Sequence, residues 1–327
     1  MLSQTLTLSN GLINMRKSSN VSSKPTNAPQ ISVMMPVYNG AKFVGNAIKS
    51  ILNQSYKDFE FVIVDDGSTD NTVDVINQFK DKRIKLIRNQ HLGLQKTLNI
   101  GLKESNGLYI ARMDADDESL PERLKLQKEF LDNNPLISCV GTRIIAVFDD
   151  KNVSKISWRP KTPVATKFIS LFETPIFHPT AMCRSEIIKR YGYNESLPRS
   201  EDYDIWSRML ADGLKITNLH QPLLTYKIHK ESFTKKAGKT NLDTVSNITL
   251  QNMQRYTKLS EQEIDTVKKY RSGYPLSLDQ WFIFFILCLK LFFEFYRKET
   301  VNLKEAPTLL RIVASLIFRT AKRSIFG

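Results

Sequence analysis

Carboxylates gather in three short stretches of the chain, VDDGSTD, MDADDES and RSEDYDIW. Charged groups spaced so tightly repel one another unless a cation, a hydrogen-bond donor or a reaction requires them. Each stretch is therefore a candidate for binding or catalysis. Their paired carboxylates are Asp65 and Asp66, then Asp114, Asp116 and Asp117, and finally Glu201 and Asp202.

The densest of the three stretches, which begins at Asp114, has three interpretations. As a calcium-binding EF-hand loop it fails, because Ser119 and Lys125 stand where that loop needs Gly and Glu. As a helix cap it is over-supplied, because one aspartate would suffice. An Asp-x-Asp pair after a strand can instead hold Mg²⁺ or Mn²⁺ and leave coordination positions for the phosphates of a substrate. The chain has neither a P-loop lysine motif nor GxGxxG, so any phosphate would be held through the metal.

The other two acidic stretches are less specific. In VDDGSTD, Gly67 allows a tight turn and residues 68–70 can cap the next helix, but capping does not require two adjacent carboxylates before them. A carboxylate there can accept hydrogen bonds from a nucleobase or a ribose hydroxyl. Glu201 and Asp202 begin a predicted helix, where the dipole favours negative charge, so capping alone is an alternative for them. His178, before Pro179, is isolated, and an isolated histidine is more often structural than a ligand.

The elements around these stretches alternate between short apolar runs and helical periodicity, which predicts βαβ units and a parallel sheet. In such sheets ligands bind beyond the carboxyl ends of the strands. The first run is expected to stop at Pro36, in front of a PVYN loop that contains Tyr38. Strands are predicted over 31–35, 59–64, 84–88, 108–113 and 136–150, and helices over 41–54, 70–79, 93–105, 120–135, 200–213 and within 240–275.

The composition is that of a globular protein, with 41% hydrophobic residues and a net charge of +14. Such a charge favours an anionic partner. Nucleic acid is not expected, because no zinc spacing, aromatic RNA-binding pattern or basic heptad is visible. The cysteines Cys139, Cys183 and Cys288 show no CxxC spacing, which predicts buried thiols in a reducing compartment.

The two ends of the chain differ from its middle. Residues 1–29 are rich in Ser, Thr and Asn, lack the apolar core of a signal peptide, and are predicted to be a disordered lead. Residues 236–327 form a helical extension whose apolar run from 281 is interrupted by Lys290 and Glu294, which argues against a membrane span. The last segment is basic and amphipathic, as in helices that lie on an anionic membrane. Core helices or a dimer interface are the alternatives.

Taken together, the stretches PVYN, VDDGS, MDADD, FHP and SEDYD, in this order and spacing, resemble the family-2 glycosyltransferases over about residues 31–230. The resemblance implies a GT-A fold, which is an α/β Rossmann-like fold with a mostly parallel central sheet flanked by helices, here over residues 30–235. It also implies transfer of a sugar from a nucleotide-diphosphate sugar, with inversion at the anomeric carbon. The larger processive members carry a QxxRW motif that this chain lacks, which favours transfer of a single sugar.

The family's roles carry over to matching positions of this chain. They predict nucleotide-sugar-binding residues, metal ligands for Mn²⁺ or Mg²⁺ on the donor diphosphate, a general base with its neighbour, and a residue near the acceptor. The nucleotide-sugar-binding residues are Pro36, Tyr38 and Asp66, and the metal ligands are Asp114 and Asp116, with Asp117 as an alternative. The general base is Asp202 with Glu201 as its neighbour, and His178 is the residue near the acceptor.

The acceptor implied by the bacterial surface-polysaccharide members is a glycan or lipid-linked saccharide of an O-antigen, a capsule or an exopolysaccharide. With the basic tail, this places the protein in the cytoplasm, peripheral on the inner face of the cell membrane. Two alternatives are a sugar nucleotidyltransferase, which usually has a Gly-rich basic loop where this chain has PVYNGAKF, and a non-catalytic nucleotide-sugar-binding protein, which would not need Asp202.

Overall fold

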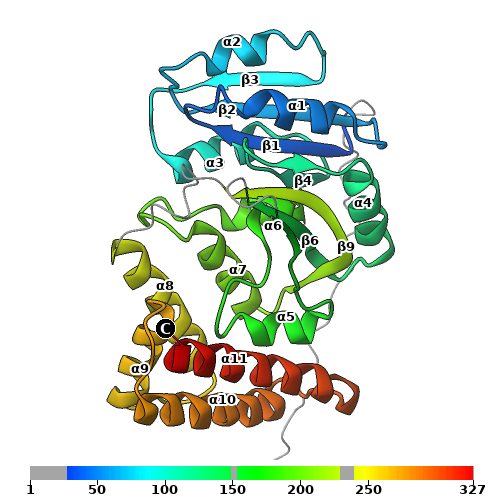
Figure 1. Ribbon diagram of the computed structural model, residues 1–327. Helices are drawn as coiled ribbons and strands as arrows, with labels where there is room; N and C mark the ends of the chain where they lie inside the picture. Colours follow the sequence, from blue (N-terminus) through cyan, green and yellow to red (C-terminus); the bar gives the residue numbers. More distant parts are fainter. Residues whose placement is uncertain (1–27, 149–152, 229–238, 327) are drawn as a thin grey trace, which may run out of the picture.

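A nine-stranded sheet with helices on its faces forms the upper part of the molecule in Figure 1, and a helical layer lies beneath it. This computed structural model describes residues 28–148, 153–228 and 239–326. The strand order is β3-β2-β1-β4-β8-β6-β9-β5, with β7 paired to β6. The predicted lead lies outside the described residues except at its last two positions.

The first half of the sheet is parallel and matches the predicted βαβ pattern. Alternate residues of its central strand face opposite sides, so Val33 and Met35 enter one core and Met34 enters the other. The helices between the strands cover both faces. The elements are β1 (Ile31–Val37), α1 (Val44–Leu52), β2 (Phe59–Asp65), α2 (Thr72–Asn77), β3 (Ile84–Arg88), α3 (Leu94–Glu104) and β4 (Tyr109–Arg112).

The second half makes the sheet mixed rather than mostly parallel. Strand β8 runs antiparallel to both β4 and β6, whereas the long strands β6 and β9 are parallel to each other. The elements are β5 (Glu118–Ser119), α4 (Arg123–Asn133), β6 (Ile137–Phe148), β7 (Val153–Ile156), α5 (Pro163–Ile169), the short 3₁₀ helix η1 (His178–Thr180), β8 (Met182–Arg184), α6 (Ser185–Tyr191), α7 (Glu201–Ala211) and β9 (Lys215–Ile228).

Two sequence expectations are wrong. Pro36 does not end the first strand, because β1 continues through it to Val37; its missing N–H is tolerated where Pro36 pairs with Val64 in the parallel ladder. Cys139 and Cys183 are not free thiols, because they face each other across β6 and β8 with Cα atoms 4.0 Å apart and form a disulfide. Cys288 is free and buried, as expected.

The C-terminal extension shares one hydrophobic core with α5. Phe168 of α5 makes edge-on ring contacts with Phe292 and Phe295, and Phe284, Leu287 and Leu291 are fully buried in the same cluster. No helix in the described ranges is long and apolar enough to cross a bilayer. The extension consists of α8 (Lys239–Gln254), α9 (Glu261–Arg271), α10 (Leu278–Lys298), the short 3₁₀ helix η3 (Leu303–Glu305) and α11 (Ala306–Phe326).

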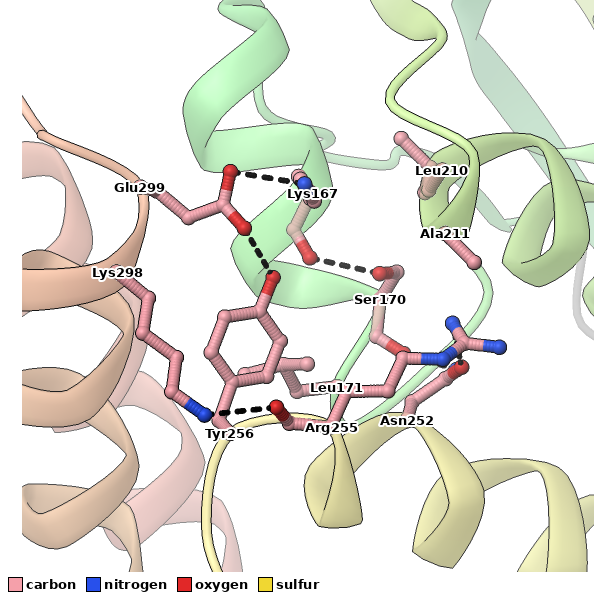
Figure 2. A pocket seen from close by; sticks show the side chains of 10 residues that line it. All are labelled: Lys167, Ser170, Leu171, Leu210, Ala211, Asn252, Arg255, Tyr256, Lys298 and Glu299. Atoms are coloured by element: carbon pink, nitrogen blue, oxygen red, sulfur yellow. Dashed lines mark hydrogen bonds and ion pairs between the residues drawn. The ribbon is translucent and has the colours of Figure 1, made fainter. Parts of the chain in front are cut away.

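A cavity of about 250 Å³ lies where this extension meets α5 and α7 (Figure 2). Its polar groups already bond one another: Glu299 accepts hydrogen bonds from Lys167 Nζ at 2.8 Å and from Tyr256 OH at 2.6 Å, and Lys298 donates to the Arg255 carbonyl. The bond from Lys167 joins the extension to α5 of the sheet domain, and the other two lie within the extension. None of the acidic stretches lines this cavity, so the candidate site lies elsewhere.

Candidate functional site

The carboxyl ends of β1, β2 and β4 meet at one edge of the sheet and bring the predicted loops together. Val37 lies opposite Asp65 in the ladder, and the Asp66 N–H continues it by donating to the Val37 carbonyl at 2.8 Å. On the other side of β1, the Met113 N–H donates to the Met34 carbonyl at 3.0 Å. The VDD loop and the acidic loop after β4 are therefore held on either side of β1.

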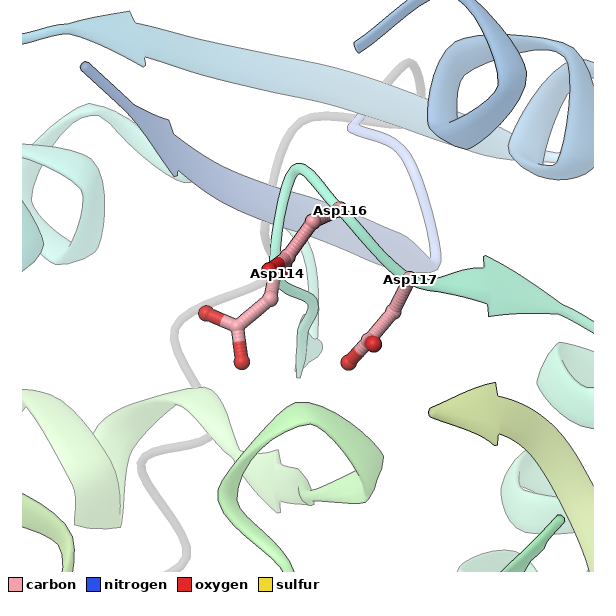
Figure 3. A group of neighbouring side chains, drawn as sticks. All are labelled: Asp114, Asp116 and Asp117. Carbon is pink, nitrogen blue, oxygen red and sulfur yellow. The ribbon is translucent and has the colours of Figure 1, made fainter. Parts of the chain in front are cut away.

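The acidic loop after β4 gathers three carboxylates, whose side chains project to the same side of the loop (Figure 3). One oxygen from each of Asp114, Asp116 and Asp117 lies within 4.8 Å of the others. Asp117 is buried, and its Oδ1 accepts a hydrogen bond from the Lys227 N–H of β9 at 3.1 Å. Its Oδ2 is also buried and has no hydrogen-bond partner among the described residues. Burial, with the charges of Asp114 and Asp116, raises the pKa of Asp117 well above its usual value.

A buried arginine lies at the end of β4, directly before this loop. Arg112 is 5% exposed, and its Nη2 lies 2.5 Å from Asp114 Oδ1. Burial disfavours the charged guanidinium, but the ion pair with Asp114 outweighs that effect and raises the pKa of Arg112. The negative charge of Glu201 acts in the same direction, so Arg112 interacts electrostatically with the second acidic pair as well as with the acidic loop. Its Nε and Nη1 have no partner in the part of the chain that the structure describes.

A second buried arginine holds the loop from α4. Arg123 is fully buried and donates to the Arg112 carbonyl at 2.6 Å, to Ser119 Oγ at 3.0 Å and to Gln127 Oε1 at 3.1 Å. Burial lowers its pKa to about 9, and the charge of Asp117 partly opposes that shift. Arg123 therefore fixes the backbone on both sides of the carboxylates and places positive charge near Asp117.

The second acidic pair begins α7 and lies against the predicted histidine. Glu201 is buried with its Oε1 3.6 Å from His178 Nδ1, and His178 Nε2 is hydrogen-bonded to Tyr193 OH at 2.8 Å. Asp202 keeps part of its surface accessible and accepts a hydrogen bond from Thr174 Oγ1 at 3.3 Å. Ser200, before the pair, has a left-handed backbone with φ of 65°, which is uncommon outside glycine and sets the direction in which α7 begins.

The protonation of this group follows from its environment. Burial raises the pKa of both Glu201 and Asp202, and the charge of Glu201 contributes to the rise at Asp202. Burial, together with the positive charge of Arg112, lowers the pKa of His178 to about 3. At neutral pH, His178 is therefore a neutral, fixed partner of Tyr193. A carboxylate with a raised pKa is a better proton acceptor than an ordinary aspartate.

The residues of the PVYN and VDD loops, which include the predicted nucleotide-binding residues Pro36, Tyr38 and Asp66, differ in burial and in the contacts that they make. Pro36 is buried within β1, and Asp65 is fully buried and accepts from the Ser68 N–H at 3.3 Å, so both belong to the scaffold. Asp66 faces the loop after β3, and Tyr38 is 45% exposed at the surface. Of these four residues, Tyr38 and Asp66 have the better placement for contact with a ligand.

The turn after Asp66 does not cap α2 as expected. Helix α2 begins at Thr72, and its N-cap residue Asn71 makes no side-chain capping bond, whereas the Ser68 hydroxyl accepts from the Asn39 N–H at 2.9 Å. In return, the Thr69 N–H donates to Asn39 Oδ1 at 2.8 Å. Only Asp70 follows the prediction in part, by accepting from the Thr72 N–H at 3.0 Å. This turn therefore ties the PVYN loop to the VDD loop.

Sequence reasoning missed the residues that connect the predicted ones: Arg112, Arg123, Tyr193 and Thr174. For Arg112 a signal existed, because a charged residue inside the apolar run YIARM needs a buried partner. The other three had none, because each is ordinary in its own segment. His91, which contacts both Tyr38 and Asp66, was missed for the same reason.

Comparisons with known proteins agree with this geometry. The sequence model described as Glycosyl transferase family 2 matches residues 32–192. The O-antigen biosynthesis glycosyltransferase WbnJ of Escherichia coli is 35% identical over 215 residues, which are 63% of this chain and 83% of WbnJ. The chain belongs to glycosyltransferase family 2.

Solved structures of low sequence identity share the fold. Residues 1–349 of S. aureus TarS, solved in complex with UDP-GlcNAc, superpose with a TM-score of 0.59 at 19% identity and 90% coverage of both chains. The mannosyltransferase PcManGT from Pyrobaculum calidifontis, in complex with GDP-Man and Mn²⁺, gives 0.54 at 17% identity, over 94% of this chain and 90% of that one. The α/β fold is therefore that of the GT-A glycosyltransferases, as the sequence resemblance implied.

The low pKa of His178 predicts a pH dependence of stability. In the unfolded chain a histidine takes up a proton near pH 6.5, whereas folded His178 stays neutral until about pH 3. The unfolded state therefore binds more protons between these values, and His178 destabilises the fold as pH falls through that window. Between pH 7.5 and 5.0 we expect its contribution to fall by about 2 kcal/mol.

Urea unfolding of the wild type and of His178→Asn at both pH values measures this contribution. The variant should lose less stability on acidification than the wild type. His220→Asn, at an exposed position, is the matched control and should behave as the wild type does. An equal loss in the wild type and His178→Asn would contradict a neutral His178.

Proposed function

We propose that this glycosyltransferase moves a single sugar, with inversion, from a nucleotide-diphosphate sugar to a hydroxyl of a lipid-linked saccharide. The product would enter a surface polysaccharide such as an O-antigen, a capsule or an exopolysaccharide. The observation that carries the proposal is the arrangement around Arg112, which is ion-paired with the carboxylate cluster through Asp114 and interacts electrostatically with a carboxylate pair of raised pKa. The first suits the leaving diphosphate and the second suits the attacking hydroxyl.

The acidic loop is proposed as the seat of a divalent cation. Carboxylate oxygens are the ligands that Mg²⁺ and Mn²⁺ prefer, and the unpartnered buried Oδ2 of Asp117 has the chemistry that such an ion would satisfy. Asp114, Asp116 and Asp117 would hold the ion, and Asp114 would stay oriented by Arg112. The bound ion would neutralise the charge of the leaving diphosphate.

Asp202 is proposed as the general base. It is the more accessible carboxylate of its pair, and Thr174 holds one of its oxygens in place. Buried Glu201 would act on Asp202 through its charge and help to place the acceptor, with His178 as a fixed wall behind it. A proton passes from the acceptor hydroxyl to Asp202 as the oxygen attacks the anomeric carbon from the face opposite the diphosphate. A single displacement without an enzyme nucleophile inverts that centre.

Attachment to the inner face of the cell membrane is supported by the surface of the extension. The outer side of α10 exposes a stripe of large apolar side chains at helical spacing, and α11 exposes Leu310 and Phe318. Isolated exposed apolar residues are common, but a continuous stripe suggests a partner. The charged residues exposed beside it are mainly basic, which complements anionic lipid. The α10 stripe is Leu278, Phe282, Ile286 and Phe293, and the basic residues are Arg297, Lys298, Lys304, Arg311, Lys322 and Arg323.

Replacing Asp117 tests the cation site. Without metal, Asp117→Asn should be at least as stable as the wild type, because the change removes a buried charge beside two like charges. Adding Mn²⁺ at about 100 times its dissociation constant should stabilise the wild type by about 2.7 kcal/mol. Most of that gain should be lost in Asp117→Asn, as measured by thermal unfolding with Mn²⁺ or EDTA. Glu122→Gln, outside the cluster, serves as control; an equal response from both variants would rule out Asp117 as a ligand.

Replacing Asp202 tests the base. Asp202→Asn keeps the shape and can still accept the Thr174 hydrogen bond, but it cannot take a proton. We expect sugar transfer to fall about 10²- to 10⁴-fold while donor binding, measured by calorimetry, stays close to that of the wild type. Asp204→Asn on the same helix should change transfer little, because Asp204 pairs with Arg208. Unchanged transfer by Asp202→Asn would refute the assignment.

Surface substitutions on α10 test membrane attachment better than removal of the extension, because deletion would also expose Phe168 and Phe172, which are buried against it. The triple change Phe282→Ser, Ile286→Ser and Phe293→Ser should reduce sedimentation with phosphatidylglycerol-containing vesicles at least tenfold, because each buried apolar side chain contributes about 1.5–3 kcal/mol. Transfer to a water-soluble acceptor should persist. Leu136→Ser, at a residue 73% exposed outside the extension, is the control. Vesicle binding equal to that of the control would contradict the proposal.

A further inference from the structure

One ring of the protein covers the surface formed by Tyr38 and Asp66. The imidazole of His91 stacks on the Tyr38 ring, with centroids 4.1 Å apart and planes 24° from parallel. In the same position its Nδ1 lies 3.1 Å from Asp66 Oδ2 and 3.2 Å from the Asp66 carbonyl oxygen. A flat nitrogen heterocycle therefore stacks on an exposed aromatic ring and contacts a carboxylate through a ring nitrogen.

A nucleobase with a ring N–H could make the same two interactions: it could stack on Tyr38 and donate a hydrogen bond to Asp66. The space is not large enough for both rings, because the Tyr38 and His91 centroids are only 4.1 Å apart and an inserted base would need about twice that separation. Asp66 is also only 6% exposed beneath this cover. A base can therefore reach Tyr38 and Asp66 only if His91 moves.

The backbone of the loop that carries His91 is anchored on both sides of this residue, because the Asn89 N–H before it donates to the Asp65 carbonyl at 2.9 Å. The Leu92 and Gly93 N–H groups donate to Asp66 Oδ1 at 2.8 Å and to Oδ2 at 3.0 Å, so the backbone beyond His91 is held. Gly67 allows the loop to come this close, because a Cβ at this position would lie 2.6 Å from the backbone nitrogen of His91. The His91 side chain itself is 59% exposed, so its ring can turn outward without opening the core.

We propose that His91 occupies the place of the nucleobase in the free enzyme and is displaced when the nucleotide sugar binds. The proposal rests on the proposed function, in which Tyr38 and Asp66 receive the base of the donor. Displacement costs free energy, so His91 lowers the affinity for every donor nucleotide and favours bases that replace both of its interactions. His91 thus sets the affinity for the donor without contacting the reacting atoms.

Calorimetric titration of the full chain with UDP, GDP and dTDP in the presence of Mn²⁺ tests this. His91→Ala should bind its preferred nucleotide about three- to tenfold more tightly than the wild type, because no stacked, hydrogen-bonded ring has to leave. His91→Phe keeps the stacking but lacks the nitrogen, so its affinity should lie between the two. His220→Ala, at an exposed histidine elsewhere, should bind as the wild type does. Thermal unfolding checks that each variant is folded.

Two results would overturn the proposal in distinguishable ways. Weaker binding by folded His91→Ala, with normal binding by the wild type, would make His91 a wall of the base site and leave the proposed function intact. Absence of nucleotide binding by the folded wild type would overturn the proposed function and this inference together.

Discussion

The buried guanidinium of Arg112 is the constraint on which the site depends. A charge with only 5% of its residue surface exposed is costly unless opposite charges lie near it, and here they come from Asp114, which is ion-paired with it, and from Glu201. The relation is reciprocal, because the positive charge of Arg112 opposes the rise in pKa that burial causes at Glu201 and Asp202. Loss of Arg112 would therefore leave buried negative charge uncompensated on both halves of the site.

This constraint also explains why the site needs a mixed sheet. The parallel half delivers the acidic loop at the end of β4, but Tyr193 and the start of α7 follow β8, which runs antiparallel beside β4. The reversed strand brings a segment eighty residues further along the chain against Arg112. His178 reaches the same place because η1 lies directly before β8, and burial there keeps its ring neutral and fixed.

Sequence periodicity could predict the local helices and strands but not these tertiary contacts between distant segments. Apolar runs located β2 and β3 to within one residue. β2 is almost wholly buried, as its continuous apolar run predicts, whereas β3 is the partly exposed strand at the edge of the sheet. The disulfide between Cys139 and Cys183 depends instead on a register between strands 44 residues apart. Which carboxylate of VDD is structural likewise depends on tertiary contacts: Asp65 turns into the loop, whereas Asp66 reaches the backbone after β3. The order of the motifs nevertheless identified the family, because the order reflects the fold.

The two halves of the site differ in how firmly they are held, and the difference suits the proposed reaction. Around Arg112 and Arg123 the contacts are buried and made by strand and helix residues, so the reacting groups are fixed in advance. Around Tyr38 the stacking contact is made by two exposed side chains, Tyr38 and His91, on loops that open at low cost. The site must admit and release a nucleotide, but it must also keep its charged groups fixed during the displacement. This division allows both, because the part that opens is separate from the groups that react.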